Sequence, residues 1–275
     1  MDATTLRKVQ LTQLAILKEF DRVCRKHNIS YILSSGTLLG AVRHQGFIPW
    51  DDDLDVDMTR ENYQRFLACA DELPENLFLQ NWHNDEEYGL PFSKIRLKNS
   101  AFREEACAKM KNCGIYIDIF PCDKFTDDAS ERRRFQKLNH YRMMILILSP
   151  VYGISPDSAL KRAGLHVLRW FLHSKKWKRR YIEKFEQLTQ MMNNTDVKSR
   201  YYENGGATPI GQWIIEPLSF KNTTLLQFED ASFSCPEDYD TYLRAVYGDY
   251  MELPPEDKRA DRHGILEVSF GEEMK

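Results

Sequence analysis

Residues 49–57 read Pro49-Trp50-Asp51-Asp52-Asp53-Leu54-Asp55-Val56-Asp57 and are the most informative segment of the chain. Carboxylates recur at positions 51, 53, 55 and 57, so a strand over residues 53–57 would present them on one face. Like charges at this spacing repel one another strongly when dehydrated, and a bound cation relieves the repulsion. Mg²⁺ prefers oxygen ligands and leaves positions for water and substrate phosphates. The stretch therefore predicts a strand that carries a magnesium site, and a solvated acidic loop is the alternative.

A glycine turn precedes the aspartates and a further carboxylate follows them. The turn reads Ser34-Ser35-Gly36-Thr37-Leu38-Leu39-Gly40. It lies between a predicted strand over residues 30–34 and a predicted short helix over 37–43. Glycine lets backbone N–H groups approach a phosphate, and a helix N-terminus adds favourable partial charge. Asp118 lies between two isoleucines on a predicted strand over 115–120. A glycine turn, an Asp-apolar-Asp strand and a later carboxylate, in this order, resemble the nucleotidyltransferase fold.

The periodicity of apolar residues places the remaining elements. It predicts helices over residues 5–27, 60–73 and 238–247, and strands over 54–58, 77–82, 92–98, 213–216 and 225–228. Residues from about 128 to 192 are helical in pattern and rich in Lys and Arg. We therefore predict an α/β (α+β) fold with a nucleotidyltransferase-like mixed sheet core and a helical insertion. The predicted parts are a catalytic core over 1–127, a mainly helical insertion over 128–210, and a C-terminal part over 211–275 that returns to the core.

Composition excludes several classes of protein. The chain has 275 residues, 42% of them hydrophobic, and a formal net charge of -3. Such a chain can form a packed core, and its charge gives no whole-molecule attraction to nucleic acid, so no nucleic-acid partner is expected. None of the six cysteines forms a C-x-x-C pair, which disfavours structural zinc.

The location of the protein follows from its N-terminus and its apolar runs. The first residues are polar and lack the apolar region of a secretory signal. The longest apolar run, residues 143–148, is far shorter than the ~20 residues that a membrane span needs. We therefore expect a cytoplasmic protein.

A basic segment raises the question of membrane contact. Residues 160–184 hold nine basic residues and one acidic residue, with aromatic side chains between them. A basic amphipathic helix of this kind can bind an anionic surface, here the inner face of the membrane. A solvated helix that packs on the core by its apolar side is the alternative, and the sequence leaves both open.

Two blocks of sequence resemble the LicD family. The first runs from Tyr31 to Val56 and joins the glycine turn to the aspartates through Arg43-His44-Gln45-Gly46-Phe47-Ile48. The second comprises Tyr247-Gly248-Asp249-Tyr250-Met251 and Pro254-Pro255-Glu256-Asp257-Lys258-Arg259. The resemblance implies transfer of phosphocholine, or a similar phospho-alcohol, from a CDP-linked donor such as CDP-choline to a hydroxyl of a cell-surface glycan precursor, with release of CMP. Teichoic acid and lipopolysaccharide sugars, free or lipid-linked, are the implied acceptors.

Phosphoryl transfer needs alignment, charge neutralisation and an activated hydroxyl. We expect Asp53 and Asp55 to bind the metal, with support from Asp51. Asp118 completes this set and can accept the proton of the acceptor hydroxyl. Two Mg²⁺ ions, with Mn²⁺ as a substitute, would hold the attacking and leaving oxygens.

The donor phosphates require positive charge and N–H groups. In addition to the turn at Ser35, Gly36 and Thr37, we expect Arg43 and His44 to bind the diphosphate, because an Arg side chain offers a rigid fork to phosphate oxygens. A second group from the C-terminal block comprises Lys258, Arg259 and His263. Structural ion pairs or a solvated surface are the alternatives.

A choline headgroup is best held by aromatic faces, because its nitrogen cannot donate a hydrogen bond. Trp50 and Tyr31 are the predicted choline ligands, with Trp50 preferred because it adjoins Asp51. Two rival functions remain open at this point: a true nucleotidyltransferase that releases pyrophosphate, and a non-catalytic module that binds a metal or a glycan.

Overall fold

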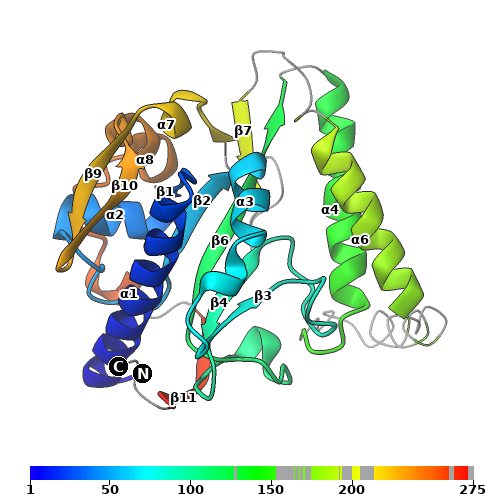
Figure 1. Cartoon of the computed structure of the whole chain (residues 1–275), viewed down its shortest axis with the longest axis horizontal. Helices are drawn as coiled ribbons and strands as arrows, with labels where there is room; N and C mark the ends of the chain where they lie inside the picture. Colours follow the sequence, from blue (N-terminus) through cyan, green and yellow to red (C-terminus); the bar gives the residue numbers. More distant parts are fainter. Residues whose placement is uncertain are drawn as a thin grey trace.

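The computed structural model describes residues 1–126, 129–152, 175–191, 193, 200–204, 214–259 and 263–271, together with Gly164, Val167 and Trp170. A mixed sheet forms the centre of the fold (Figure 1). Its seven strands are β1 (Ile32–Leu33), β2 (Asp55–Thr59), β3 (Leu77–Gln80), β4 (Ser93–Leu97), β6 (Tyr116–Phe125), β7 (Arg200–Glu203) and β8 (Ile214–Ile215).

The long strand β6 organises this sheet. The strand order is β1-β2-β6-β4-β3, and β7 pairs with the second half of β6 and with β8. The pair β2–β6 is parallel, whereas the other pairs of described strands in this sheet are antiparallel. This mixed sheet confirms the predicted α/β class.

Helices and two small two-stranded antiparallel sheets surround the central sheet. The helices are α1 (Ala3–Lys26), α2 (Ser35–His44), α3 (Arg60–Leu67), α4 (Ala129–Ile147), α6 (Lys175–Gln190), α7 (Leu218–Lys221) and α8 (Tyr239–Tyr247). The described residues also form three short 3₁₀ helices, which are η1 (Ala70–Glu72), η2 (Glu105–Cys107) and η3 (Glu256–Lys258). The small sheets pair β9 (Thr223–Phe228) with β10 (Ala231–Pro236), and β5 (Ala101–Glu104) with β11 (Ile265–Ser269). Figure 1 shows α1 and α3 across one face of the central sheet and α4 beside α6.

Helix α1 fixes the core side of the sheet. Its first turn is capped by Asp2, whose carboxylate accepts hydrogen bonds from two backbone N–H groups at 3.0 Å. The apolar face that the sequence predicted is fully buried, and it comprises Val9, Ile16, Phe20 and Val23. The inward residues of β2, Val56 and Met58, join the same core. Because side chains alternate across a strand, Asp55 and Asp57 must lie on the opposite face of the sheet.

Most predicted elements appear in the structure, although their ends differ. The helix predicted over 60–73 stops at Leu67 and continues as the separate turn η1. Strands β5, β10 and β11 were not predicted. Residues 200–203, within the predicted insertion, form β7 of the central sheet. The division of the chain into three parts stays a prediction.

The basic segment over 160–184 is described in part. Lys161, Arg162 and Arg169 lie outside the described residues. On α6, Trp177 is 38% exposed, whereas Lys178 is buried and was not expected to be. Within the described ranges, no helix is both long and apolar enough to cross a bilayer.

We predict that Gly40→Ala destabilises the fold. A Cβ at position 40 would lie 2.4 Å from the backbone oxygen of Gly46, which belongs to the loop leading from α2 to the aspartates. Overpacking against backbone costs about 1–3 kcal/mol. Urea unfolding should show this loss, and Gly164→Ala is the control, because a Cβ there meets no heavy atom within 4 Å. Equal stability of both variants would contradict the prediction.

Candidate active site

A cavity of about 1030 Å³ opens on the face of the sheet opposite α1 and α3. Its walls include the start of α2, the aspartate loop, strands β2, β4 and β6, residues between 247 and 255, and His263. The site therefore combines both blocks of sequence that the family resemblance had singled out.

Asp51, Asp53, Asp55 and Asp118 all line this cavity, so the structure brings the predicted carboxylates together. Asp55 and Asp118 are register partners on the parallel strands β2 and β6, which places them side by side on one face. Asp57 lies on the same face but is fully buried, and it does not line the cavity.

Burial leaves these carboxylates in a strained electrostatic state. Desolvation raises the pKa of Asp53 and, with repulsion from Asp53 and Asp118, raises the pKa of Asp55 well above its ordinary value. The pKa of Asp118 is raised to about 6 by desolvation, against the opposing effect of the ammonium group of Lys94. A bound cation would relieve this repulsion.

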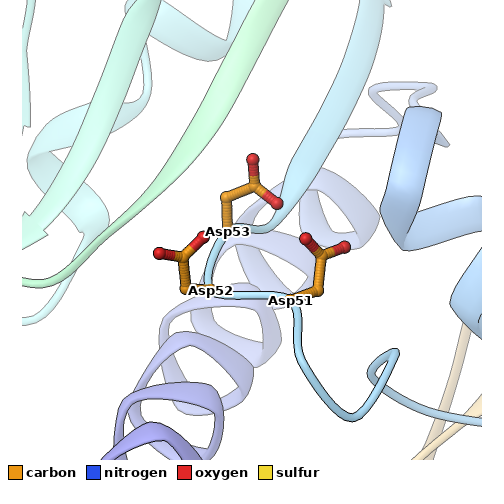
Figure 2. Close-up of side chains that lie close together, drawn as sticks. All are labelled: Asp51, Asp52 and Asp53. Atoms are coloured by element: carbon orange, nitrogen blue, oxygen red, sulfur yellow. The ribbon is translucent and has the colours of Figure 1, made fainter. Parts of the chain in front are cut away.

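The donor set fits a hard divalent cation, because it consists of carboxylate oxygens. Ligand atoms of Asp51, Asp52 and Asp53 lie within 4.8 Å of one another. In Figure 2 the three carboxylates extend from the same turn, with that of Asp53 between those of Asp51 and Asp52. Asp52 is also only 1% exposed and pairs with His263. Asp51, Asp53, Asp55 and Asp118 therefore remain the predicted metal ligands, whereas the Asp52 carboxylate is engaged by His263.

Helix α1 holds the aspartate loop through two buried glutamines that sequence analysis missed. The Gln10 side-chain amide donates to the backbone oxygens of Ile48 at 3.3 Å and Asp51 at 2.9 Å. Gln13 donates to the backbone oxygen of Asp52 at 2.8 Å. The sequence signal that could have identified them is the position of two polar side chains on the buried face of an amphipathic helix. These bonds fix the loop backbone independently of any ligand.

The glycine turn packs against the same loop. Ser35 and Gly36 line the cavity, and a Cβ at Gly36 would lie 2.6 Å from Asp51 Oδ2. Thr37 does not line the cavity; its hydroxyl oxygen instead accepts a hydrogen bond from the backbone N–H of Asp55 at 2.8 Å. Its predicted contact with phosphate is thus replaced by a structural contact that joins α2 to β2.

His263 brings the C-terminal segment to the carboxylates. Its Nδ1 lies 2.7 Å from Asp52 Oδ1, and its Nε2 lies 3.6 Å from Asp53 Oδ2. The hydrogen bond to Asp52 raises the pKa of His263 to about 9, so the ring is a cation at neutral pH. It compensates part of the acidic charge at the cavity wall.

Two arginines approach one another near Trp50. Arg43 lines the cavity and donates to the backbone oxygen of Tyr250 at 2.7 Å. The guanidinium of Arg259 lies 5.3 Å from the centroid of the Trp50 ring and donates to the backbone oxygen of Pro254. Desolvation and the charge of Arg259 lower the pKa of Arg43. Since these bonds go to uncharged groups, both arginines keep a positive charge that an anion can use.

Three of the remaining predicted ligands, His44, Lys258 and Tyr31, do not line the cavity. His44 accepts a hydrogen bond from Arg43 Nε at 3.0 Å, and Lys258 is exposed. The prediction for Tyr31 is not supported, because this residue is buried in the core and its hydroxyl donates to Asp21 Oδ1 at 2.6 Å. Trp50 does line the cavity.

Lys94 is the main cavity residue that sequence analysis missed. Its ammonium lies 2.7 Å from Asp118 Oδ1 and 3.3 Å from the centroid of the Tyr116 ring. Lys94 and Arg96 alternate with Ile95 and Leu97 along β4, so two cations on one face of a strand were a usable signal. Glu203 of β7 also lines the cavity, but no motif marked it.

We predict that Gln13→Met weakens binding of a divalent metal. The variant keeps an apolar stem but loses the hydrogen bond to the Asp52 carbonyl, which is worth about 0.5–1.5 kcal/mol. Calorimetric titration with Mn²⁺ should show an affinity loss of about 2–10-fold. The exposed Gln64→Met variant is the control. An unchanged affinity at reduced thermal stability would limit Gln13 to a folding role.

We also predict that metal affinity falls as pH drops through about 6. A carboxylate must lose its proton to bind a metal, and the pKa of Asp118 is raised to about 6, so protons compete with the metal below that pH. Titrations at pH of about 5 and about 7.5, in buffers of different ionisation enthalpy, measure both the affinity and the released protons. Equal affinity at the two pH values would contradict this.

Comparison with known proteins agrees with this geometry. The family described as LicD/FKTN/FKRP, nucleotidyltransferase domain, matches residues 28–146. The chain is 31% identical over 270 residues to the lipopolysaccharide cholinephosphotransferase LicD of Haemophilus influenzae, which covers 96% of this chain and 97% of that protein. An uncharacterized protein of Rickettsia prowazekii is 33% identical over 154 residues, or 54% of this chain and 52% of its own length. With both sequence blocks meeting at one acidic cavity, the chain belongs to the LicD family of transferases with a nucleotidyltransferase-type domain.

Proposed function

We propose that the protein transfers phosphocholine from a CDP-linked donor to a hydroxyl of a cell-surface glycan precursor and releases CMP. The single observation that carries this proposal is the union of acidic and basic groups in one cavity, with Asp51, Asp53, Asp55 and Asp118 facing the same space as Arg43. Similarity to the Haemophilus cholinephosphotransferase over 96% of the chain supports the choice of phosphocholine. Lipopolysaccharide is therefore the first acceptor to test, and teichoic acid the second.

The four cavity carboxylates would hold Mg²⁺, or Mn²⁺ in its place. When bound, the metal would neutralise charge on the phosphate oxygens during transfer. The protein contributes a fixed set of ligands, because Gln10 and Gln13 hold the loop that carries Asp51.

Asp118 is our choice for the general base. In the reaction, the acceptor oxygen forms a bond to the phosphorus of phosphocholine, the bond from that phosphorus to the CMP oxygen breaks, and the hydroxyl proton passes to Asp118. Its pKa of about 6 leaves it ionised at neutral pH and able to take a proton in the transition state. Lys94 supports the ionised form through the 2.7 Å ion pair.

Arg43 and Arg259 suit the diphosphate of the donor. Their charges lie near each other at the Trp50 side of the cavity, and the flat guanidinium groups match phosphate oxygens. The Trp50 ring lies at the same place, with the Arg259 guanidinium 5.3 Å from its centroid. His263 was predicted to bind a donor phosphate. Its ring nitrogens face Asp52 and Asp53, so we do not assign it a direct phosphate contact.

The rest of the proposal concerns the acceptor. A glycan that is still attached to its lipid carrier would bring the enzyme to the inner face of the membrane, where basic groups on α6 could contact anionic lipid. The exposed basic residues of that helix are Lys175, Lys176, Arg179, Arg180 and Lys184.

We predict that Asp53→Ala abolishes metal-dependent release of CMP. Removal of a cavity carboxylate should lower the rate by at least about 100-fold, because charge neutralisation is the main catalytic contribution in phosphoryl transfer. The assay follows CMP from CDP-choline with Mg²⁺ and with EDTA, in the presence of lipopolysaccharide acceptor. The exposed Asp71→Ala variant is the control.

The products of this assay also decide between the rival functions. Pyrophosphate in place of CMP would identify a nucleotidyltransferase. Binding of metal without turnover of any CDP-alcohol would identify a non-catalytic module. Full activity of Asp53→Ala would contradict the assignment of the metal site.

A further inference from the structure

One part of the cavity has a different character from the carboxylate region. Its walls are mainly aromatic and apolar, and they comprise Tyr88, Leu90, Phe92, Met110, Leu146 and Tyr152, which we call the aromatic chamber. These residues come from the segment between β3 and β4, the segment after η2, the end of α4, and the turn that follows α4. Since the aromatic chamber shares the cavity with Asp118, a ligand can reach from one to the other.

The aromatic rings of the chamber pack against one another. Tyr88 and Phe92 lie edge to face, with ring centroids 6.3 Å apart and planes at 86°. The ring centroids of Phe92 and Phe120 lie 4.5 Å apart, and Lys94 Nζ lies 5.5 Å from the Phe92 centroid. Since Tyr88 and Phe92 are buried, the half-buried Tyr152 is the chamber ring that a ligand can reach, and ring faces attract cations.

The side-chain oxygen acceptors of the chamber are the hydroxyl groups of Tyr88 and Tyr152. The Tyr88 side chain is fully buried, so a ligand does not reach its hydroxyl. The Tyr152 hydroxyl accepts from the backbone N–H of Gly89 at 3.2 Å. A primary ammonium group would leave most of its three donors unpaired here, whereas a trimethylammonium group has no donors to satisfy.

The charges beside the chamber are compatible with a cation. Lys94 is paired with Asp118, and Arg96 donates to the Gln80 side chain and to the backbone oxygen of Gly114. Glu104 also lines the cavity, where its carboxylate accepts from the Tyr116 hydroxyl at 2.6 Å. The nearby cations are thus occupied, and one further carboxylate faces the cavity.

The Trp50 side of the cavity is less suitable for a cation. The Arg259 guanidinium already lies 5.3 Å from the Trp50 ring centroid, and the charge of Arg43 is close by. A second cation at that ring would meet uncompensated positive charge. This argues against the predicted choline contact at Trp50 and leaves that side to the phosphates.

The wall of the chamber is fixed before any ligand binds. Lys178 of α6 is buried and donates to the backbone oxygens of Glu86 at 2.6 Å and Tyr88 at 2.8 Å. A rigid wall lowers the entropy cost of binding.

We propose that the aromatic chamber binds the trimethylammonium group of the phosphocholine donor. This inference rests on the proposed function. It predicts that the enzyme selects a donor by the methylation of its ammonium group, through Tyr152 and its neighbours, while the nucleotide binds elsewhere.

The test measures equilibrium binding of CDP-choline, CDP-ethanolamine and CMP, with Mg²⁺ and without acceptor. The wild type should prefer CDP-choline to CDP-ethanolamine. Tyr152→Leu should lower affinity for CDP-choline by about 10-fold, because one cation–π face is lost, and leave affinity for CMP unchanged. Tyr152→Phe keeps the ring and should retain the preference. Tyr181→Leu, which replaces a half-buried tyrosine outside the cavity, is the control.

Three results would overturn the inference, and they differ from failure of the proposed function. An equal loss for all three ligands would place the nucleoside in the chamber. No loss in Tyr152→Leu, with wild-type preference for CDP-choline intact, would place choline elsewhere. A preference that disappears in Tyr152→Phe would assign selectivity to the hydroxyl. If the wild type binds no CDP-alcohol at all, the proposed function itself fails and the inference falls with it.

Discussion

The parallel pairing of β2 and β6 is the constraint on which the rest of the site depends. It puts Asp55 directly beside Asp118 on one face of the sheet, while Val56 and Ile119 enter the core on the other. Carboxylates so close and so far from water oppose folding, as their raised pKa values indicate. Side chains from several other segments of the chain compensate for this repulsion.

The compensation is distributed over distant parts of the chain. Lys94 comes from β4, His263 from the C-terminal segment, and Gln10 and Gln13 from α1. The two cations offset charge, whereas the two glutamines act on the backbone and prevent the loop from relaxing away from the carboxylates. Each group therefore keeps the acidic side chains together in a different physical way. Their joint effect is to keep the acidic side chains together at the wall of the cavity.

Sequence could predict the fold class and the four carboxylates, because both follow from local patterns: period two around Asp53 and Asp55, helical period over residues 5–27, and a later Asp118 between isoleucines. It could not predict partners that are brought together only by tertiary packing. Lys94 and Asp118 are 24 positions apart, and the cation needs the register of β4 on β6 to reach the carboxylate. The predicted choline contact of Tyr31 was not supported for a related reason. Nearness in sequence to a motif does not determine whether a side chain faces the cavity or the core.

The distance along the chain between Asp52 and His263 has a consequence for synthesis. The two residues are 211 positions apart, yet they share a hydrogen bond at the cavity wall. Strand β11, which follows His263, is anchored on β5 in the first half of the chain. The strands of the central sheet can therefore pair on the ribosome before the segment around His263, which forms the last wall of the cavity, has been synthesised. The cavity therefore reaches its complete form only after residue 263 has been synthesised, and before that point Asp52 and Asp53 lack the imidazole group of His263.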